Sequence, residues 1–176
     1  MGKPRVSFRE AFGTTLERVY THKKQSGGSG QYAEIKMIFE PGEPGSGVQF
    51  SDEIVGGRIP REFIPSVEYA IRTECKRGQV AGYEVVDFKA RLIDGKYHDV
   101  DSSALAFEIA GRAAFREAHR SSRPKLLEPV MKVETVTPSD HLGDVIGDVN
   151  RRRGTILEQL ERGANIAVVS TVPLSE

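Results

Sequence analysis

QYAEIKMIFE, the stretch from Gln31 to Glu40, alternates polar and apolar side chains along most of its length. The inward set consists of Ala33, Ile35, Met37 and Phe39. Successive side chains of a strand point to opposite faces of a sheet, so a period of two predicts a half-buried β-strand. The segments on either side decide what kind of sheet this strand joins.

The flanking sequence predicts a hairpin and a third strand. Residues 17–24 precede the segment QSGGSG, from Gln25 to Gly30, which indicates a β-hairpin with a flexible, glycine-rich tip. Residues 41–47 are rich in glycine and proline and predict a second turn. Residues 48–54 are expected to form the third strand.

A helix is predicted after this strand. Pro60 and Pro65 lie near its start, and Gly78 is expected at its C-cap because glycine adopts the left-handed conformation without a steric penalty. Its apolar face, at helical spacing, consists of Ile64, Val67, Ile71 and Cys75. Cys75 therefore fits core packing better than nucleophilic chemistry.

A strand and a second helix follow. Residues 86–92 alternate in polarity and predict a strand, which Asp94-Gly95 ends with a turn signal. The helix starts after Asp101-Ser102-Ser103, all of which are good N-cap residues. The side chains expected to face inward are Leu105, Ile109 and Ala113, with Ala106 and Ala110.

A domain boundary is predicted in SSRPKLLEP, residues 121–129, which divides the chain into domains 1–125 and 126–176. Beyond it come a strand (131–137), a helix (142–150) and two strands (154–160 and 166–172). This β-α-β-β order is a ferredoxin-like unit without its last helix and strand. The fold class is α+β. One face of the second sheet is expected to be half covered, which leaves beside solvent either Ile166, Val168 and Val172 or Ala167, Val169 and Thr171.

Charge and composition limit the classes of partner and cellular location that fit this chain. Lys+Arg and Asp+Glu both total 25, so any contact with nucleic acid must come from a local basic surface. A single cysteine fits a reducing compartment. No apolar stretch is long enough to span a membrane, and the N-terminus has no apolar signal core. A cytoplasmic protein without membrane contacts is expected.

The acid-free run VYTHKKQSGGSGQ, residues 19–31, has two interpretations. Lys23 and Lys24 beside the glycines could contact an RNA backbone, or the segment could be a plain solvated hairpin. Its GGSG is not a nucleotide-binding loop, because no lysine followed by Ser or Thr closes it. Hydrolysis of GTP or ATP by this chain is therefore not expected.

YHDVDSS, residues 97–103, also leaves alternatives open. His98, Asp99 and Asp101 could belong to a metal site or an acid–base pair, which would make the chain a small hydrolase or metalloprotein. Asp101 has a simpler role as a helix cap. The His98 ring could stack on a nucleotide, or it could be an ordinary turn residue.

Three consecutive arginines, Arg151, Arg152 and Arg153, follow the helix of the second domain. Cations at a helix C-terminus oppose the negative end of its dipole, which is a sufficient structural reason for them. Three in succession cannot all face one way, so at least one is expected to be free for a phosphate. Both roles remain open on sequence grounds.

Long strings in this chain resemble elongation factor G. They are HKKQSGGSGQY (22–32), IVGGRIPREFIPSVEYAI (54–71), AGYEVVDFKARLIDGKYHDVDSSALAFEIAG (81–111), LLEPVMKVE (126–134) and GDVIGDVNRRRG (143–154). The similarity runs in order along the chain and matches the fourth domain of that factor and the first half of its fifth.

The resemblance implies a fourth domain with a left-handed β-α-β crossover, also seen in a ribosomal small-subunit protein fold, before the truncated ferredoxin-like unit. It implies the ribosome, ribosomal RNA and the tRNA–mRNA duplex as partners during translocation. The residues implied at the decoding site are Lys23, Lys24, Gln25, Ser26, Gly27, Gly28, Ser29, Gly30, Gln31, Lys96, His98 and Asp99. Arg151, Arg152 and Arg153 are implied to contact ribosomal RNA. Neither a catalytic nor a metal-binding residue is implied.

The GTP-binding domain of that family is not in this sequence, so GTP and magnesium would be bound elsewhere in the parent protein and no cofactor is expected here. An alternative is a stand-alone regulator that occupies the ribosomal A site without GTP. The open strand edges of an incomplete second sheet could also pair in a non-native dimer.

Overall fold

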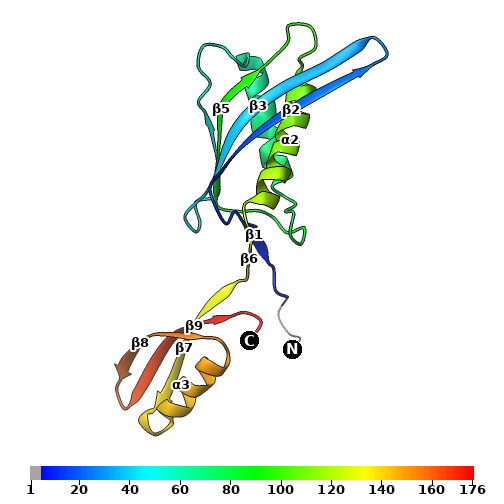
Figure 1. Cartoon of the computed structure of the whole chain (residues 1–176). Helices are drawn as coiled ribbons and strands as arrows, with labels where there is room; N and C mark the ends of the chain where they lie inside the picture. The colour runs from blue at the N-terminus through cyan, green and yellow to red at the C-terminus, as the bar shows by residue number, and fades with distance from the viewer. Residues whose placement is uncertain (1–4) are drawn as a thin grey trace. The chain divides into compact units, whose positions relative to one another are not determined.

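The computed structural model describes residues 5–176, which form two compact units. The larger unit is Arg9–Leu127, and the smaller consists of residues 128–176 together with 5–8. Figure 1 shows their elements. The division of the chain into domains 1–125 and 126–176 stays a prediction.

The larger unit has a four-stranded sheet in the order β2-β3-β5-β4. Its strands are β2 (Leu16–Ser26), β3 (Ser29–Pro41), β4 (Val48–Asp52) and β5 (Phe88–Lys96). The predicted 31–40 strand is the central part of β3, and the predicted hairpin is β2–β3, paired from Leu16↔Phe39 to Ser26↔Ser29. Both predictions are confirmed.

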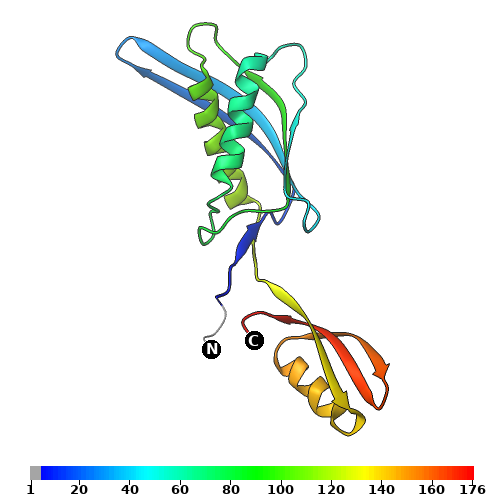
Figure 2. The same cartoon turned by 180° about the vertical axis from the view of Figure 1, so that it is seen from behind.

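Two helices, α1 (Ile64–Glu74) and α2 (Ala104–Ser121), cover one face of this sheet, which Figure 2 shows from the helix side. A short 3₁₀ helix, η1 (Arg61–Phe63), precedes α1. β4 and β5 are parallel neighbours joined through α1. With both strands pointing upward, β5 lies to the right of β4 while α1 lies behind the sheet (Figure 1), so the crossover is left-handed. The fold implied by the resemblance is confirmed.

The core lies between the helices and the sheet. Ala33, Ile35, Met37 and Phe39 of β3 are fully buried, as their alternation predicts. The α1 face and Cys75 are buried too, and burial raises the pKa of the Cys75 thiol. Small residues of α2, including Ala106, Ala110 and Gly111, permit close approach: a Cβ at Gly111 would lie 2.9 Å from that of Ala70.

Three local predictions are wrong. Leu105 is 55% exposed, because the buried face of α2 is centred on Phe107, Ala114 and Phe115. Gly78 is not the cap of α1, which ends at Glu74; it is packed against a buried carboxylate and has no space for a Cβ. Asp94-Gly95 is not a turn, because β5 continues through it beside a bulge between Lys36 and Met37.

A two-stranded ribbon that the sequence did not predict lies at the ends of this unit. β1 (Arg9–Ala11) pairs antiparallel with β6 (Lys125–Leu127), from Arg9↔Leu127 to Ala11↔Lys125. A Cβ at Gly13 would lie 1.9 Å from the carbonyl oxygen of Arg123, so only glycine fits there. The two ends of the unit are therefore held side by side.

The smaller unit is a three-stranded antiparallel sheet in the order β7-β9-β8 with one long helix. Its elements are β7 (Val130–Pro138), η2 (Ser139–His141), α3 (Leu142–Arg151), β8 (Thr155–Arg162) and β9 (Asn165–Pro173). The predicted β-α-β-β order is confirmed. The predicted exposure on β9 is wrong: Ala167, Val168, Val169 and Val172 are buried because β9 is the central strand, while Ile166 and Thr171 are half-buried.

Candidate nucleic-acid interface

The β2–β3 hairpin runs out beyond the end of α2, which Figures 1 and 2 both show. Its tip is a two-residue turn in which Gly27 (φ 63°) and Gly28 (φ 110°) adopt conformations that favour glycine, with open space around both. Lys23, Lys24 and Gln25 are exposed on the β2 side of the tip. The predicted basic segment is therefore an accessible, glycine-tipped ribbon.

Gln31, on the β3 side, is less free than its neighbours. Its Oε1 lies 2.9 Å from Nε2 of His22 on the paired strand, and its side chain is half-buried. This cross-strand bond fixes the Gln31 amide just behind the tip.

The loop between β5 and α2 is tied to this hairpin. The Ser102 hydroxyl donates to the Tyr32 carbonyl oxygen at 2.6 Å, and the Tyr32 N–H donates to the Asp101 carbonyl oxygen at 2.9 Å. The His98 N–H in turn donates to Ser102 Oγ at 2.9 Å. A Cβ at Gly30 would lie 2.9 Å from the Asp101 carboxylate, so the two segments touch. The two predicted contact loops are thus joined into one surface.

His98 stacks on Tyr32 within this surface. The ring centroids are 3.7 Å apart and the ring planes are inclined by 4°. His98 is exposed, whereas Tyr32 is half-buried. The pKa of the Tyr32 hydroxyl is raised, first by burial and then by the Glu34 carboxylate. An aromatic pair with an accessible imidazole can stack on a nucleobase or donate a hydrogen bond to it.

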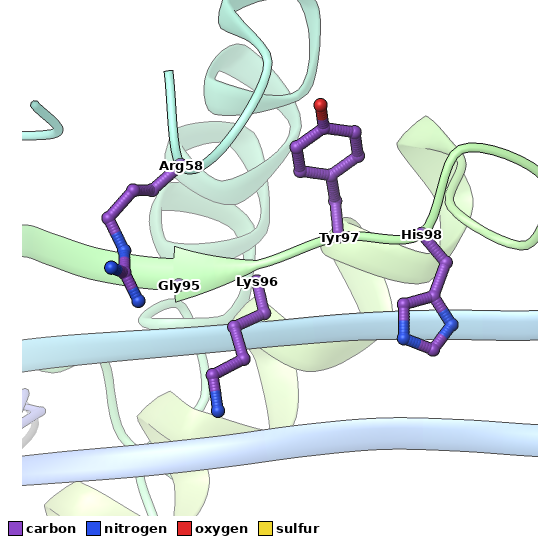
Figure 3. Close-up of a pocket in the computed structure, with 5 residues that line it drawn as sticks. All are labelled: Arg58, Gly95, Lys96, Tyr97 and His98. Carbon is purple, nitrogen blue, oxygen red and sulfur yellow. The ribbon is translucent and has the colours of Figure 1, made fainter. Parts of the chain in front are cut away.

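Next to this pair is a hollow of about 280 Å³, drawn in Figure 3. Arg58, Lys96 and His98 point to one side of the chain there, and Tyr97 points to the other (Figure 3). Lys96 pairs with Glu34 at 3.4 Å, and the Arg58 guanidinium pairs with Asp94. Both cations are more than half exposed, so these ion pairs are weak and solvent-screened.

The acidic residues of the 97–103 loop neither cap the helix nor form a metal cluster. Asp99 is exposed, and the N-cap of α2 is Ser103, whose side chain accepts a hydrogen bond from the Ala106 N–H at 3.1 Å. The predicted capping role of Asp101 is therefore wrong. Among residues 5–176, no three His, Cys, Asp or Glu side chains gather in a way that could hold a metal ion.

The three consecutive arginines of the smaller unit all have acidic partners. Arg151 and Arg152 bond to Asp148, and the pKa of that carboxyl is lowered as a result. Arg153, at φ 56°, forms two bonds with the Glu128 carboxylate and one with Glu176. Arg151 is the most exposed of the three, with 77% of its side chain accessible. Arg153 has a clear structural role, and Arg151 is the best placed for an external phosphate.

Three residues of the interface could not be found from local sequence patterns. Tyr32 and Ser102 are 70 positions apart, so no local pattern connects them. Arg58 lies in the segment between β4 and η1, directly after Gly56 and Gly57. The only local indication of a functional role is a positively charged side chain that directly follows two glycines.

Comparisons with known proteins identify families and relatives that this chain is similar to. Residues 4–123 match the family model "Elongation factor G, domain IV", and residues 125–176 match "Elongation factor G C-terminus". Proteins named elongation factor G are 56% identical over 176 residues in Granulibacter bethesdensis and 54% identical over 175 residues in Jannaschia sp. strain CCS1. These alignments cover 100% and 99% of the chain and 25% of each relative.

A crystal structure from Thermus thermophilus is also similar, with a TM-score of 0.83 and 39% identity over 99% of this chain and 26% of the other. The chain therefore spans about a quarter of the length of the curated relatives it matches. No helix of the described residues has the length and hydropathy needed to cross a membrane.

Proposed function

The chain belongs to the elongation factor G family, and on this premise we propose that its larger unit is an arm that promotes movement of tRNA and mRNA through the ribosome. The tip of β2–β3 and the loop 97–103 would enter the decoding region of the small subunit and contact the tRNA–mRNA duplex. Lys23, Lys24 and Lys96 would meet phosphates, and the glycines of the tip would let its backbone approach RNA closely.

The observation that carries this proposal is the joining of the two loops. The Ser102–Tyr32 and Tyr32–Asp101 hydrogen bonds hold the 97–103 loop against the hairpin. A surface that must contact a duplex at a fixed place gains from being ordered before it binds, because less conformational entropy is then lost on binding. His98, supported on one face by Tyr32, is the side chain best placed to contact a base.

The smaller unit is proposed to contact ribosomal RNA of the large subunit near its GTPase-associated region. Arg151 is the main candidate, and Arg152 and Arg153 would contribute to the positive potential around it. The ion pairs of Arg152 and Arg153 with Asp148, Glu128 and Glu176 limit their availability.

We further propose that this chain is not itself an enzyme. GTP and magnesium would be bound by another part of the whole factor, and the protein would act in the cytoplasm. Calorimetry can test this directly: the chain should show no saturable binding of GTP, and micromolar affinity would contradict the proposal.

The decisive experiment uses a full-length factor that carries this segment. His98→Ala should slow translocation about tenfold in stopped-flow kinetics, because stacking of a base on an aromatic side chain contributes roughly 1–3 kcal/mol. Ribosome-stimulated GTP hydrolysis should be largely unchanged. His141→Ala, which removes another exposed histidine, in η2, is the control. Translocation at the unchanged rate in the His98 variant would show that His98 is only an exposed turn residue.

A further inference from the structure

A second hollow lies in the larger unit, where the segment after α1 meets the last turns of α2. Its volume is about 600 Å³, and it is lined by residues 77–82 together with Glu74 and Arg116. Arg116 is twelve residues beyond the first residue of α2, so it lies roughly 18 Å along the helix axis from the end that carries the 97–103 loop. The proposed tip contacts do not use this region.

Backbone hydrogen bonds to two buried side chains fix the segment 79–83, which forms the base of this hollow. The buried Glu10 carboxylate accepts hydrogen bonds from the backbone N–H groups of Val80, Ala81 and Tyr83, at 2.8–3.1 Å. The Gln79 N–H donates to Nδ1 of the buried His119 at 3.2 Å. These backbone donors all point inward, so any recognition of an anion in this hollow depends mainly on side chains.

Three arginines surround the segment. Arg77 and Arg116 line the hollow, and Nη2 of Arg120 lies 3.5 Å from Oε1 of Gln79. All three are exposed, and neither Arg77 nor Arg120 has an acidic partner among residues 5–176. We name Arg77, Arg116 and Arg120 together the Gln79 rim.

The acidic groups nearby do not neutralise the rim. The Glu10 carboxylate is fully buried and bonded to backbone N–H groups. Glu74 lines the hollow, but its side chain is only 16% exposed and it is shared between Arg112 at 3.4 Å and Arg116 at 3.3 Å. Glu117 precedes Arg120 by three residues on α2 and forms no ion pair within the described chain. The guanidinium groups of Arg77 and Arg120 are therefore left without a carboxylate partner among residues 5–176.

Guanidinium groups are suited to phosphate because their planar donors match its oxygens in pairs. We propose that the Gln79 rim, Arg77, Arg116 and Arg120, is a second RNA-binding surface that takes backbone phosphates of structured ribosomal RNA. The surface rests on the proposed function, since it assumes that the chain acts on the ribosome. Because it is remote from the tip and consists of guanidinium groups, which would contact phosphates, it would add affinity and orientation without reading sequence.

The test compares three forms of this 176-residue chain: the unchanged chain, a triple variant with Arg77→Gln, Arg116→Gln and Arg120→Gln, and a charge-matched control with Arg5→Gln, Arg61→Gln and Lys125→Gln. Binding to ribosomes and to protein-free ribosomal RNA is measured between about 50 and 200 mM salt. The rim variant should bind both at least tenfold more weakly at low salt. Its slope of log affinity against log salt should be smaller by about 2–3, roughly one for each lost phosphate contact.

Any result other than the expected one contradicts the proposal. An equal loss in the control variant would mean that only net charge matters. Weaker binding to ribosomes with unchanged binding to protein-free RNA would identify a ribosomal protein as the partner. If the unchanged chain does not bind ribosomes, the proposed function is wrong as well. If the rim variant binds as tightly as the unchanged chain, only the proposed role of the rim is wrong. Thermal unfolding checks that each variant is folded. The Glu74 carboxylate keeps its ion pair with Arg112 when Arg116 is replaced, so it is not left without a partner.

Discussion

His98 and Tyr32 lie face to face, with ring centroids 3.7 Å apart. One face of the imidazole is therefore covered by the chain itself, and the exposed remainder of the ring is available to a ligand. Tyr32 lies on β3 four residues after Gly28 of the hairpin tip, and its backbone also bonds to Asp101 and Ser102. On the proposed function, Tyr32 would therefore position His98 for contact with RNA.

Tyr32→Leu should release His98 from this position, whereas Tyr32→Phe should keep it, because the stacking depends on the ring and not on the hydroxyl. In NMR spectra of this chain, the His98 ring protons should lie upfield from the ring current of Tyr32. They should move toward random-coil shifts in the Leu variant and stay in place in the Phe variant. Identical His98 shifts in all three forms would contradict the stacked arrangement.

Gly95→Ala should destabilise the larger unit. The new Cβ would lie 2.4 Å from the Glu34 carbonyl oxygen and 2.5 Å from Cδ1 of Ile59, and the carbonyl belongs to the sheet and cannot move aside. Overpacking of this kind costs about 1–3 kcal/mol. The matched control is Gly147→Ala in α3, which has open space around it and should gain about 0.5–1 kcal/mol for the smaller unit. Urea unfolding followed by NMR resolves the two units, and an unchanged midpoint for Gly95→Ala would contradict the crowding.

The stability of the larger unit should fall as the pH drops below about 6.5. His119 is fully buried and its pKa is lowered, because burial disfavours the charged ring more than the nearby Glu10 carboxylate favours it. The unfolded chain, with an ordinary histidine pKa near 6.5, then takes up the proton first. The contribution of His119 is fully present above that pH and is lost as the pH falls toward the lower folded-state pKa, by at most about 1.4 kcal/mol per pH unit.

The check is a comparison of the pH slope of unfolding free energy between pH 5 and 7 in the unchanged chain and in His119→Gln. The glutamine amide can still accept the bond from the Gln79 N–H, but it does not titrate. The variant should show the shallower slope. Equal slopes would mean that His119 does not carry the dependence.

Hydrogen exchange should show unequal protection of the two units. The smaller unit buries few apolar side chains, mainly Val149, Ala167, Val168, Val169 and Val172, while Val136 and Leu160 remain exposed. Residues 128–176 should therefore exchange faster than 9–127 unless the open edges of β7 or β8 pair with another copy. Measurement at two protein concentrations distinguishes these cases. Equal protection at both concentrations would show that the smaller unit is self-sufficient.

Periodicity predicted most of the fold because it reports local burial. The alternation in 31–40 and the helical face from Ile64 to Cys75 both correspond to buried surfaces. The prediction failed where a tertiary contact overrides a local signal. Asp94-Gly95 is typical of a turn, but pairing with Lys36 and Ile35 on β3 continues the strand through it.

The candidate site was predictable only as two separate loops. The tip lysines and His98 stood out by residue type, whereas their connection depends on contacts between Tyr32 and residues about 70 positions later. Leu105 shows the same limit for packing: the sequence predicts a helix there, but the neighbours of α2 decide which face is buried. From the sequence alone, the burial of Leu105 cannot be ranked against that of Ala106 and Ala110.

The β1–β6 ribbon also lies where a pulling force on the two ends of the larger unit would first act. Its outermost pair is Arg9↔Leu127, directly beside residues 8 and 128, where the chain enters and leaves the unit. A force that pulls these two points apart would act first on the three residue pairs from Arg9↔Leu127 to Ala11↔Lys125, and β1 is held further by the backbone bonds of Glu10 with Glu84 and Val86. The four-stranded sheet lies outside that first line of force. The ribbon would therefore resist separation of the two ends of the unit before the pairing within the four-stranded sheet is loaded.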